Sequence, residues 1–383
     1  WAASEWRGHA LDSLLPERFP RSAEAFLDWV QHTPVSLNYV AADIGDNIGY
    51  QQTGAYPLRS PGRSGLLPVR GWEEGEGWTG LGDGASLARE MNPAEGFLVS
   101  ANNHIRGKGS ADVVVLHMGD YRSLRIADML RASGTLSPRS MKRIQTDVYS
   151  SQAERYGALW RSLLPLDLPA GRMLSGWDYR LDKDSNAAVL FRMIHTDLLR
   201  EVFGKRMFGE DQWNQLVGNT ALVGLKEWWF DRVILSRRSE WMAEEEWDVL
   251  LADILQRVGK QWEEWVEGEE EHSNSNAVLD AGTYGSTHNL TLRHMLFDDL
   301  PTVFAFKYGP FPLEGGYGTV SQTIESGGSV IGPSWRVVMD LGRDGFESAL
   351  TGGVSARPLS GLYASDVRLH LQKRYKTLVP RPQ

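Results

Sequence analysis

The feature that most constrains the fold is a change along the chain in the spacing of apolar residues and in the content of glycine and proline. A central block carries apolar residues at helical spacing, most clearly over residues 242–266. The stretches on either side are rich in glycine, proline and short β-favouring runs. Strands, then helices, then strands again predict an α+β protein. We expect a sheet-rich part over residues 1–119, a helical insertion over 120–272, and C-terminal strands completing the core over 273–383.

Local signals predict the elements of the N-terminal part. Ser22 is a typical N-cap residue and predicts a short helix over about 20–31. Two strands are expected over 36–43 and 47–50, joined by a tight turn. Residues 53–95 are rich in glycine and proline and predict a long excursion with little regular structure. Residues 96–101 predict another strand.

The central block predicts several helices. Ser137-Pro138 is typical of a helix start, with a cap followed by proline at the first helical position. The expected helices cover about 122–130, 137–164, 184–203, 209–232 and 242–266. Strands return after residue 273 and are expected over about 328–351.

Composition and missing motifs exclude several classes of function. The 383 residues contain no cysteine, which excludes disulfides, thiolate metal sites and a cysteine nucleophile. The formal net charge of −9 provides no basic field for nucleic acid or an anionic membrane. No apolar run is long enough to span a membrane. Phosphate-loop, nucleophile-elbow and H-E-x-x-H motifs are also absent, so the residues alone suggest no self-contained active site.

The main recognisable block of this sequence is the hairpin LNYVAADIGDNIGYQQTGAYP at residues 37–57. Further blocks are NPAEG at 92–96, the Asn102-Asn103 pair, YRSLRI at 121–126, GPFPLEGG at 309–316, GPSWR at 332–336 and GGVS at 352–355. Together these blocks span nearly the whole chain. Their sequences and their order resemble the penicillin acylase family of N-terminal nucleophile hydrolases.

This resemblance implies a fold and an activity. The fold would be part of a four-layer αββα sandwich with a large helical insertion. The family's precursors cut themselves into a small and a large chain, and the large chain begins with a serine that attacks the amide. Known activities include the deacylation of penicillins and of N-acyl homoserine lactones, with roles in antibiotic resistance and quorum quenching. A periplasmic or secreted location is also implied.

The sequence departs from the family pattern at its start. Residue 1 is Trp, which is no nucleophile, and it aligns well inside the family's large chain. We therefore expect the serine nucleophile on a segment absent from this chain. The expected partners are the remaining N-terminal segment of the large chain, the small chain of the same precursor and a small-molecule amide substrate. The chain alone is expected to be inactive.

The resemblance assigns two residues to the catalytic centre. In the family, an asparagine matching Asn102 donates its side-chain N–H to the tetrahedral oxyanion, where a neutral donor is needed. A purely structural alternative is an asparagine that bonds only to backbone. Arg122 matches an arginine near the active centre, which could orient the nucleophile's surroundings or a substrate carboxylate. Its alternative is a salt bridge at a helix start.

Two further residues are candidates for binding. Asp112 lies near the place where some family members have a calcium ligand, so a structural calcium is one interpretation, although the chemistry itself needs no cofactor. Leu37 aligns with an apolar residue of the acyl pocket, and its alternative is a core leucine.

Two rival functions remain open at this stage: a non-catalytic scaffold, and a carbohydrate-binding chain. The second would use some of the 15 tryptophans for sugar stacking. Packing in the core is the other explanation of the tryptophans, since many have helical spacing. Exposed, coplanar tryptophans would favour sugar binding, and buried ones would count against it.

Overall fold

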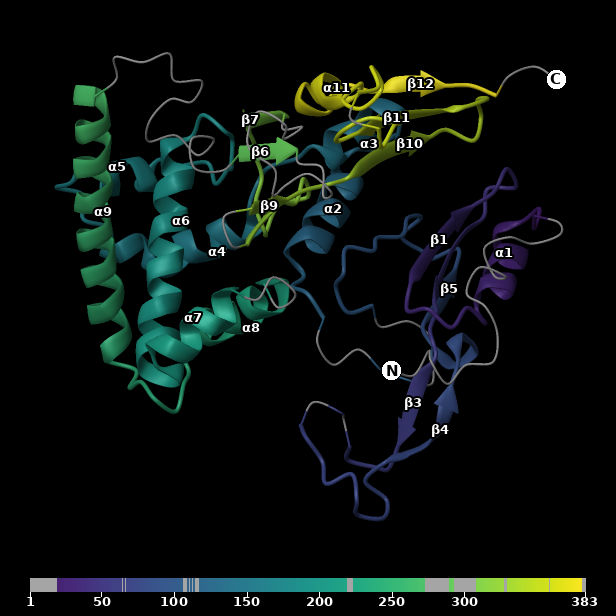
Figure 1. The fold of residues 1–383 in the computed structure, drawn as a ribbon, viewed down its shortest axis with the longest axis horizontal. Coiled ribbons are helices and arrows are strands. Elements are labelled where there is room, and N and C mark those ends of the chain that lie inside the picture. Colours follow the sequence, from purple (N-terminus) through teal and green to yellow (C-terminus); the bar gives the residue numbers. More distant parts are fainter. Residues whose placement is uncertain are drawn as a thin grey trace. The chain divides into compact units, whose positions relative to one another are not determined.

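The computed structural model describes residues 19–63, 65, 67–105, 109, 111, 113, 117–218, 223–272, 289–292, 308–326, 329–357 and 359–380. They form two compact units, which meet in sequence between Ser123 and Leu124. Each unit mixes helices with antiparallel strands (Figure 1). The three-part division at residues 119 and 272 stays a prediction.

Unit 1 is built on a helix packed against a small sheet. Helix α1 (Ala23–Val30) begins at Ser22, whose Oγ accepts a hydrogen bond from the N–H of Ala25 at 3.2 Å, as predicted. It contacts the antiparallel strands β1 (Asn38–Ala42) and β2 (Ile48–Gln52), and β5 (Arg89–Met91) pairs with β2. Gly49 of β2 permits this close packing, since a Cβ there would collide with Leu27 of the helix.

The turn between β1 and β2 is organised by one carboxylate. Asp43 accepts hydrogen bonds from the backbone N–H groups of Ala23 (2.8 Å), Gly45 (2.8 Å) and Asn47 (3.2 Å). Together these bonds, with that from Ala23 the strongest, lower the pKa of Asp43. The predicted hairpin is thus confirmed, and its turn is hydrogen-bonded to the start of α1.

Two predictions for the rest of unit 1 are wrong. Residues 53–95 contain more regular structure than expected, because β3 (Tyr56–Arg59) and β4 (Trp78–Gly82) form an antiparallel hairpin and β5 joins the sheet. Residues 97–100 do not form a strand. An isolated β-favouring run needs a neighbour to bond its backbone, and no described strand pairs with this one.

In unit 2, helices surround one large apolar core. Trp247, Leu251 and Ile254 of the longest helix, α9, are buried in it with residues of α6 such as Leu190 and Ile194. Figure 1 shows α9 running beside α6, and the two are in contact. The helices are α2 (Tyr121–Ala132, which starts in unit 1), α3 (Pro138–Gln145), α4 (Ser151–Trp160), α5 (Pro169–Ser175), α6 (Asn186–Leu199), α7 (Glu210–Gly218), α8 (Val223–Ser236) and α9 (Glu246–His272).

The single helix predicted from Ser137 to about Leu164 is two helices. Ser137 caps α3 as expected, but α3 ends at Gln145, and Ser150 caps a new helix, α4. Between them, the chain pairs with a distant segment: Leu181 donates to the carbonyl of Val148 and Ser150 donates to that of Tyr179, both at 2.9 Å. These long-range bonds replace the helical ones. Similarly, the helix expected to reach Phe203 turns π-helical over Arg200–Phe208.

Unit 2 also contains a fully buried polar cluster. Asp231 of α8 is 0% exposed and accepts hydrogen bonds from the hydroxyl of Tyr156 (2.6 Å) and the side-chain amide of Gln152 (2.7 Å). Its Oδ1 also lies 3.0 Å from Nε2 of His195. One carboxylate therefore joins α4, α6 and α8 within the apolar core.

The C-terminal strands form a three-stranded antiparallel sheet, and two of them lie within the stretch 328–351 where strands were predicted. Strands β10 (Trp335–Met339), β11 (Phe346–Leu350) and β12 (Lys376–Leu378) follow one another across it. Helices α3 and α11 (Val367–Leu371) both contact this sheet (Figure 1). The antiparallel pairs β6 (Asn289–Leu292) with β7 (Tyr308–Pro312) and β8 (Ile324–Ser326) with β9 (Ser329–Ile331) complete the described strands.

The tryptophans divide between core and surface. Trp160, Trp213, Trp247 and Trp262 are buried in the helical core, which is the packing role expected from their spacing. Trp72, Trp78, Trp229 and Trp335 are exposed, but they belong to four separate segments of the chain. The buried group counts against a general sugar-stacking role.

Candidate oxyanion site

Asn102 lies in the irregular segment between β5 and α2. Its φ is 62°, a left-handed conformation that asparagine adopts more readily than most residues. The N–H of Met118 donates to the carbonyl of Asn102 at 3.0 Å, which ties the position to the chain just before α2. The side chain is exposed, while the preceding Ala101 is buried. The backbone is thus anchored and the amide is presented at the surface of unit 1.

Arg122, the second residue of α2, holds this amide in place. Its Nη2 donates to the backbone carbonyl of Ala101 at 2.5 Å and to Oδ1 of Asn102 at 2.6 Å. A guanidinium has donors only, so the amide must turn its oxygen toward Arg122 and its nitrogen away. Among the described residues, Nδ2 of Asn102 has no hydrogen-bond partner. The structure therefore brings these two predicted residues together, with the N–H donors of Asn102 left unused.

The neighbouring asparagine is used differently. Oδ1 of Asn103 accepts from the N–H of Ala101 at 3.1 Å, and its Nδ2 donates to the carbonyl of His104 at 3.4 Å. Its side chain thus serves the local backbone. Two adjacent asparagines therefore differ in kind: one amide shapes the loop and the other is oriented outward by an arginine.

Two histidines close to this site were missed by sequence reasoning. The rings of His104 and His117 are stacked, with centroids 5.2 Å apart and planes inclined by 15°. Nδ1 of His117 lies 2.8 Å from the carbonyl of Met118, so this nitrogen carries the proton and donates it. The two residues are thirteen positions apart in a segment without regular periodicity, so no spacing pattern could reveal the stack.

Of the two predicted binding residues, the structure describes Leu37 but not Asp112. Leu37 precedes β1 and is 41% exposed, so it is not the core leucine of the alternative interpretation. Its carbonyl accepts a hydrogen bond from the N–H of Thr53 at 2.9 Å. Asp112 lies outside the described residues. Among the residues that the structure describes, no three histidine, aspartate or glutamate side chains are grouped so that they could hold a metal ion.

The arrangement of Asn102 and Arg122 can stabilise a negatively charged oxygen. A neutral amide N–H, fixed by an arginine and free of internal partners, can donate to an oxygen that becomes negative during a reaction. A carboxylate at this position would repel such an oxygen. The arginine is engaged through its own donors, so its positive charge lies behind the amide and favours a developing anion in front of it. The site is suited to stabilising an oxyanion rather than to covalent attack.

Comparisons with known proteins agree on one family. The model of the family described as penicillin amidase matches residues 1–383. The acyl-homoserine lactone acylase QuiP of Pseudomonas aeruginosa is 26% identical over 91% of this chain and 44% of its own length. The penicillin acylase 2 proenzyme of Pseudomonas sp. SE83 is 30% identical over 44% of this chain and 22% of its own length. The chain thus spans less than half the length of these curated relatives.

A solved structure supports the fold. The thermostable penicillin G acylase from Alcaligenes faecalis superposes with a TM-score of 0.66, at 16% identity, over 94% of this chain and 67% of that one. This likeness agrees with the expected mixture of helix and sheet. Across the described part of the chain, no helix combines the length and apolarity that a membrane crossing requires.

Proposed function

Because the chain belongs to the penicillin amidase family, we propose that it forms part of an amide hydrolase and supplies the oxyanion donor Asn102. The reaction is the removal of an acyl group from a linear amide. Attack on the carbonyl carbon leaves a negative charge on the carbonyl oxygen, and the Nδ2–H of Asn102 would donate to it. The nucleophile would be a serine on polypeptide other than these 383 residues, and the chain alone would be inactive.

The observation that carries this proposal is the hydrogen bond from Arg122 to Oδ1 of Asn102 at 2.6 Å. It selects one orientation of the amide before any substrate arrives. A preorganised donor needs no rearrangement when charge develops, which is the condition for electrostatic stabilisation of a transition state. Arg122 acts through Asn102, and is therefore a positioning residue in this proposal.

The names of the relatives suggest the substrate class. One relative is an acyl-homoserine lactone acylase and others are penicillin acylases. We therefore propose an amide of the β-lactam or N-acyl homoserine lactone type. The proposed partners are the rest of a large chain and a small chain cut from one precursor, in a periplasmic or secreted enzyme. Leu37 would contact the acyl group, and any calcium would involve Asp112.

The test is amide hydrolysis by the assembled protein. The chain is produced together with the proposed partner polypeptides, and the release of product from phenylacetyl and fatty-acyl amides is followed. We expect hydrolysis by the assembly and none by residues 1–383 alone. Hydrolysis by the isolated chain would refute the proposed location of the nucleophile. No hydrolysis of either amide class by a folded assembly would refute the proposed activity.

A further inference from the structure

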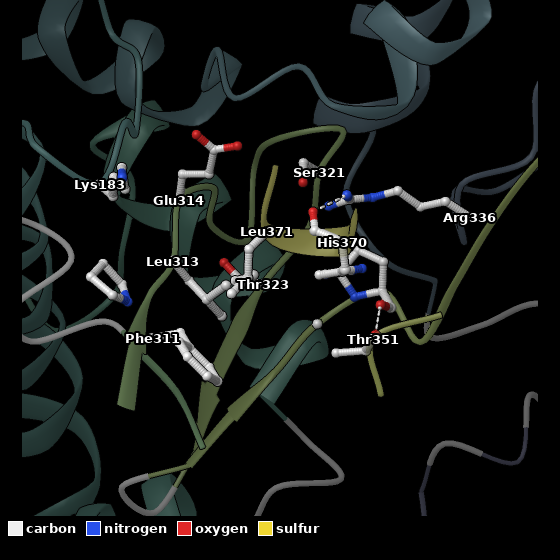
Figure 2. A pocket seen from close by; sticks show the side chains of 13 residues that line it. Lys183, Phe311, Leu313, Glu314, Ser321, Thr323, Arg336, Thr351, His370 and Leu371 are labelled. Atoms are coloured by element: carbon white, nitrogen blue, oxygen red, sulfur yellow. Dashed lines mark hydrogen bonds between the residues drawn. The ribbon is translucent and has the colours of Figure 1, made fainter. Parts of the chain in front are cut away.

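A cavity of about 170 Å³ lies in unit 2, among β7, the loop after it, the start of β10 and α11 (Figure 2). Phe311 and Leu313 line it on one side in this view, and Arg336 and His370 lie on the other. The cavity is therefore amphipathic, with an apolar side and a side that carries a cation. None of these residues belongs to the Asn102 site.

Arg336 is the unusual member of this lining. It is only 8% exposed, and its Nη1 donates to the backbone carbonyl of His370 at 2.9 Å. Among the described residues, its Nε has no hydrogen-bond partner, its Nη2 donates to none, and no carboxylate forms an ion pair with it. Burial lowers the pKa of Arg336, although a guanidinium stays protonated in proteins. A buried cation of this kind is costly unless an anion accompanies it.

The neighbouring charges do not neutralise it directly. The carboxylate of Glu314 also lines the cavity, but its Oε1 is 2.5 Å from Nζ of Lys373 and forms an ion pair there. Lys183, exposed at the rim, adds a further positive charge. His370 is 4% exposed, and burial, followed by the charge of Arg336, lowers its pKa to about 4. Its ring is neutral at pH 7, and its buried Nδ1 has no partner in the described structure.

We propose that this cavity binds a small monocarboxylic acid with an apolar body. Nη2 of Arg336 donates to no described residue, and a guanidinium N–H is a suitable donor to a carboxylate oxygen. The apolar body lies against Phe311 and Leu313. A cavity of about 150 Å³ accommodates benzene, so a volume of this size fits an acid about as large as benzoate. This is a second binding site, separate from the proposed hydrolysis.

The probe is benzoate, with benzamide as its uncharged counterpart. Binding to the full chain, in the assembly in which it is purified, is followed by saturation-transfer NMR. We expect saturable binding of benzoate with a Kd on the order of 1–10 mM, as suits a ligand of nine non-hydrogen atoms. Benzamide has the same shape without the charge, and it should bind at least tenfold more weakly.

Two variants separate charge from space. Arg336→Gln removes the cation and should weaken benzoate binding at least tenfold. Gly332→Leu fills the cavity without altering Arg336: within 4 Å, a Cβ at Gly332 meets only the methyl group of Thr323, at 3.5 Å. This variant should abolish binding. Gly361→Leu is the matched control, because a Cβ there meets nothing within 4 Å and Gly361 does not line the cavity. It should bind benzoate like the unmodified chain.

Several results would overturn the proposal. The first is a lack of saturable benzoate binding up to 50 mM, which is on the order of five times the weakest expected Kd. The second is equal binding of benzoate and benzamide. The third is unchanged benzoate binding in a folded Gly332→Leu variant. If Arg336→Gln fails to fold, the benzamide comparison and the Gly332→Leu variant still decide the question. Thermal melting of each variant reports whether it is folded.

Discussion

The Asn102 site of unit 1 and the Asp231 cluster of unit 2 are both small groups of polar side chains, but they differ in burial and in hydrogen bonding. Asp231 is completely buried and accepts bonds from Gln152 and Tyr156, with His195 also within bonding distance. Asn102 is exposed, and its amide nitrogen is left without a described partner. In the first cluster, the polar side chains bond to one another. In the second, the Nδ2–H donors of Asn102 have no acceptor among the described residues.

This difference assigns the Asp231 cluster to the stability of the fold and the Asn102 site to the proposed reaction. A buried carboxylate with several donors holds three helices in one arrangement, and removing it leaves those donors unsatisfied in an apolar core. A surface amide contributes little to folding, but it can contribute to a transition state. Substitutions in the two clusters should therefore affect different measurements. Four tests follow, one of them at His370, which lies outside both clusters.

The largest effect is expected for Asp231→Ala. The donors of Gln152, Tyr156 and His195 would lose their acceptor inside the core, so the free energy of unfolding should fall by about 3–5 kcal/mol. Chemical denaturation measures the change. Asp253→Ala, at an exposed pair with Arg257, is the control and should change it by less than about 1 kcal/mol. A loss that small for Asp231→Ala would remove the structural role assigned to the cluster.

Asn102→Ala should instead lower turnover while leaving stability nearly intact. The lost donor acts only when the oxygen becomes anionic, so kcat of the assembled enzyme should fall by roughly a hundredfold or more, about 3 kcal/mol, with a much smaller effect on substrate binding. Asn102→Asp should be at least as damaging, because it replaces a donor by a negative charge. The control is Asn103→Ala, whose side chain bonds to backbone, and kcat should fall by less than about tenfold. Equal losses for both asparagines would contradict the assignment.

His370 offers a third test, because it is buried without the partners that Asp231 has. Burial, followed by the charge of Arg336, lowers its pKa from 6.5 to about 4, so the unfolded chain binds the proton more tightly than the folded one. The contribution of His370 to the free energy of unfolding is therefore full above pH 6.5. It declines as the pH falls toward 4, by at most about 3 kcal/mol. Unfolding curves between these pH values should show the decline. It should shrink in His370→Gln, and an identical decline in that variant would exclude His370 as its cause.

The smallest effect is expected for Arg122→Lys. Lysine keeps the charge but loses the planar group that donates to both Ala101 and Asn102. The amide of Asn102 would be less well oriented, so kcat should fall by about tenfold, roughly 1.4 kcal/mol. In the Asn102→Ala background the same substitution should add little, since no amide remains to be positioned. Independent, additive losses would instead show that Arg122 acts on the substrate directly.

Local chemistry made much of this fold predictable. The capped helix α1, the hairpin of β1 and β2, the start of α3 and the strands β10 and β11 all follow from caps, turn residues and periodicity within a few positions. Resemblance to the family pointed to Asn102 and Arg122 together. The errors occurred where distant segments compete, as at residues 146–150, which bond to residues 179–181 instead of continuing a helix.

The sequence by itself determined the fold class and the family, and its resemblance to that family predicted the two site residues, because these depend on short-range patterns and on the order of blocks along the chain. Only the tertiary structure decided that Arg122 turns the amide of Asn102 outward, that His104 stacks on His117, and that Arg336 is buried without a carboxylate. Hydrogen bonds, ring stacking and desolvation depend on distances between residues that no spacing in the sequence encodes. They exist only once the chain has brought those residues together.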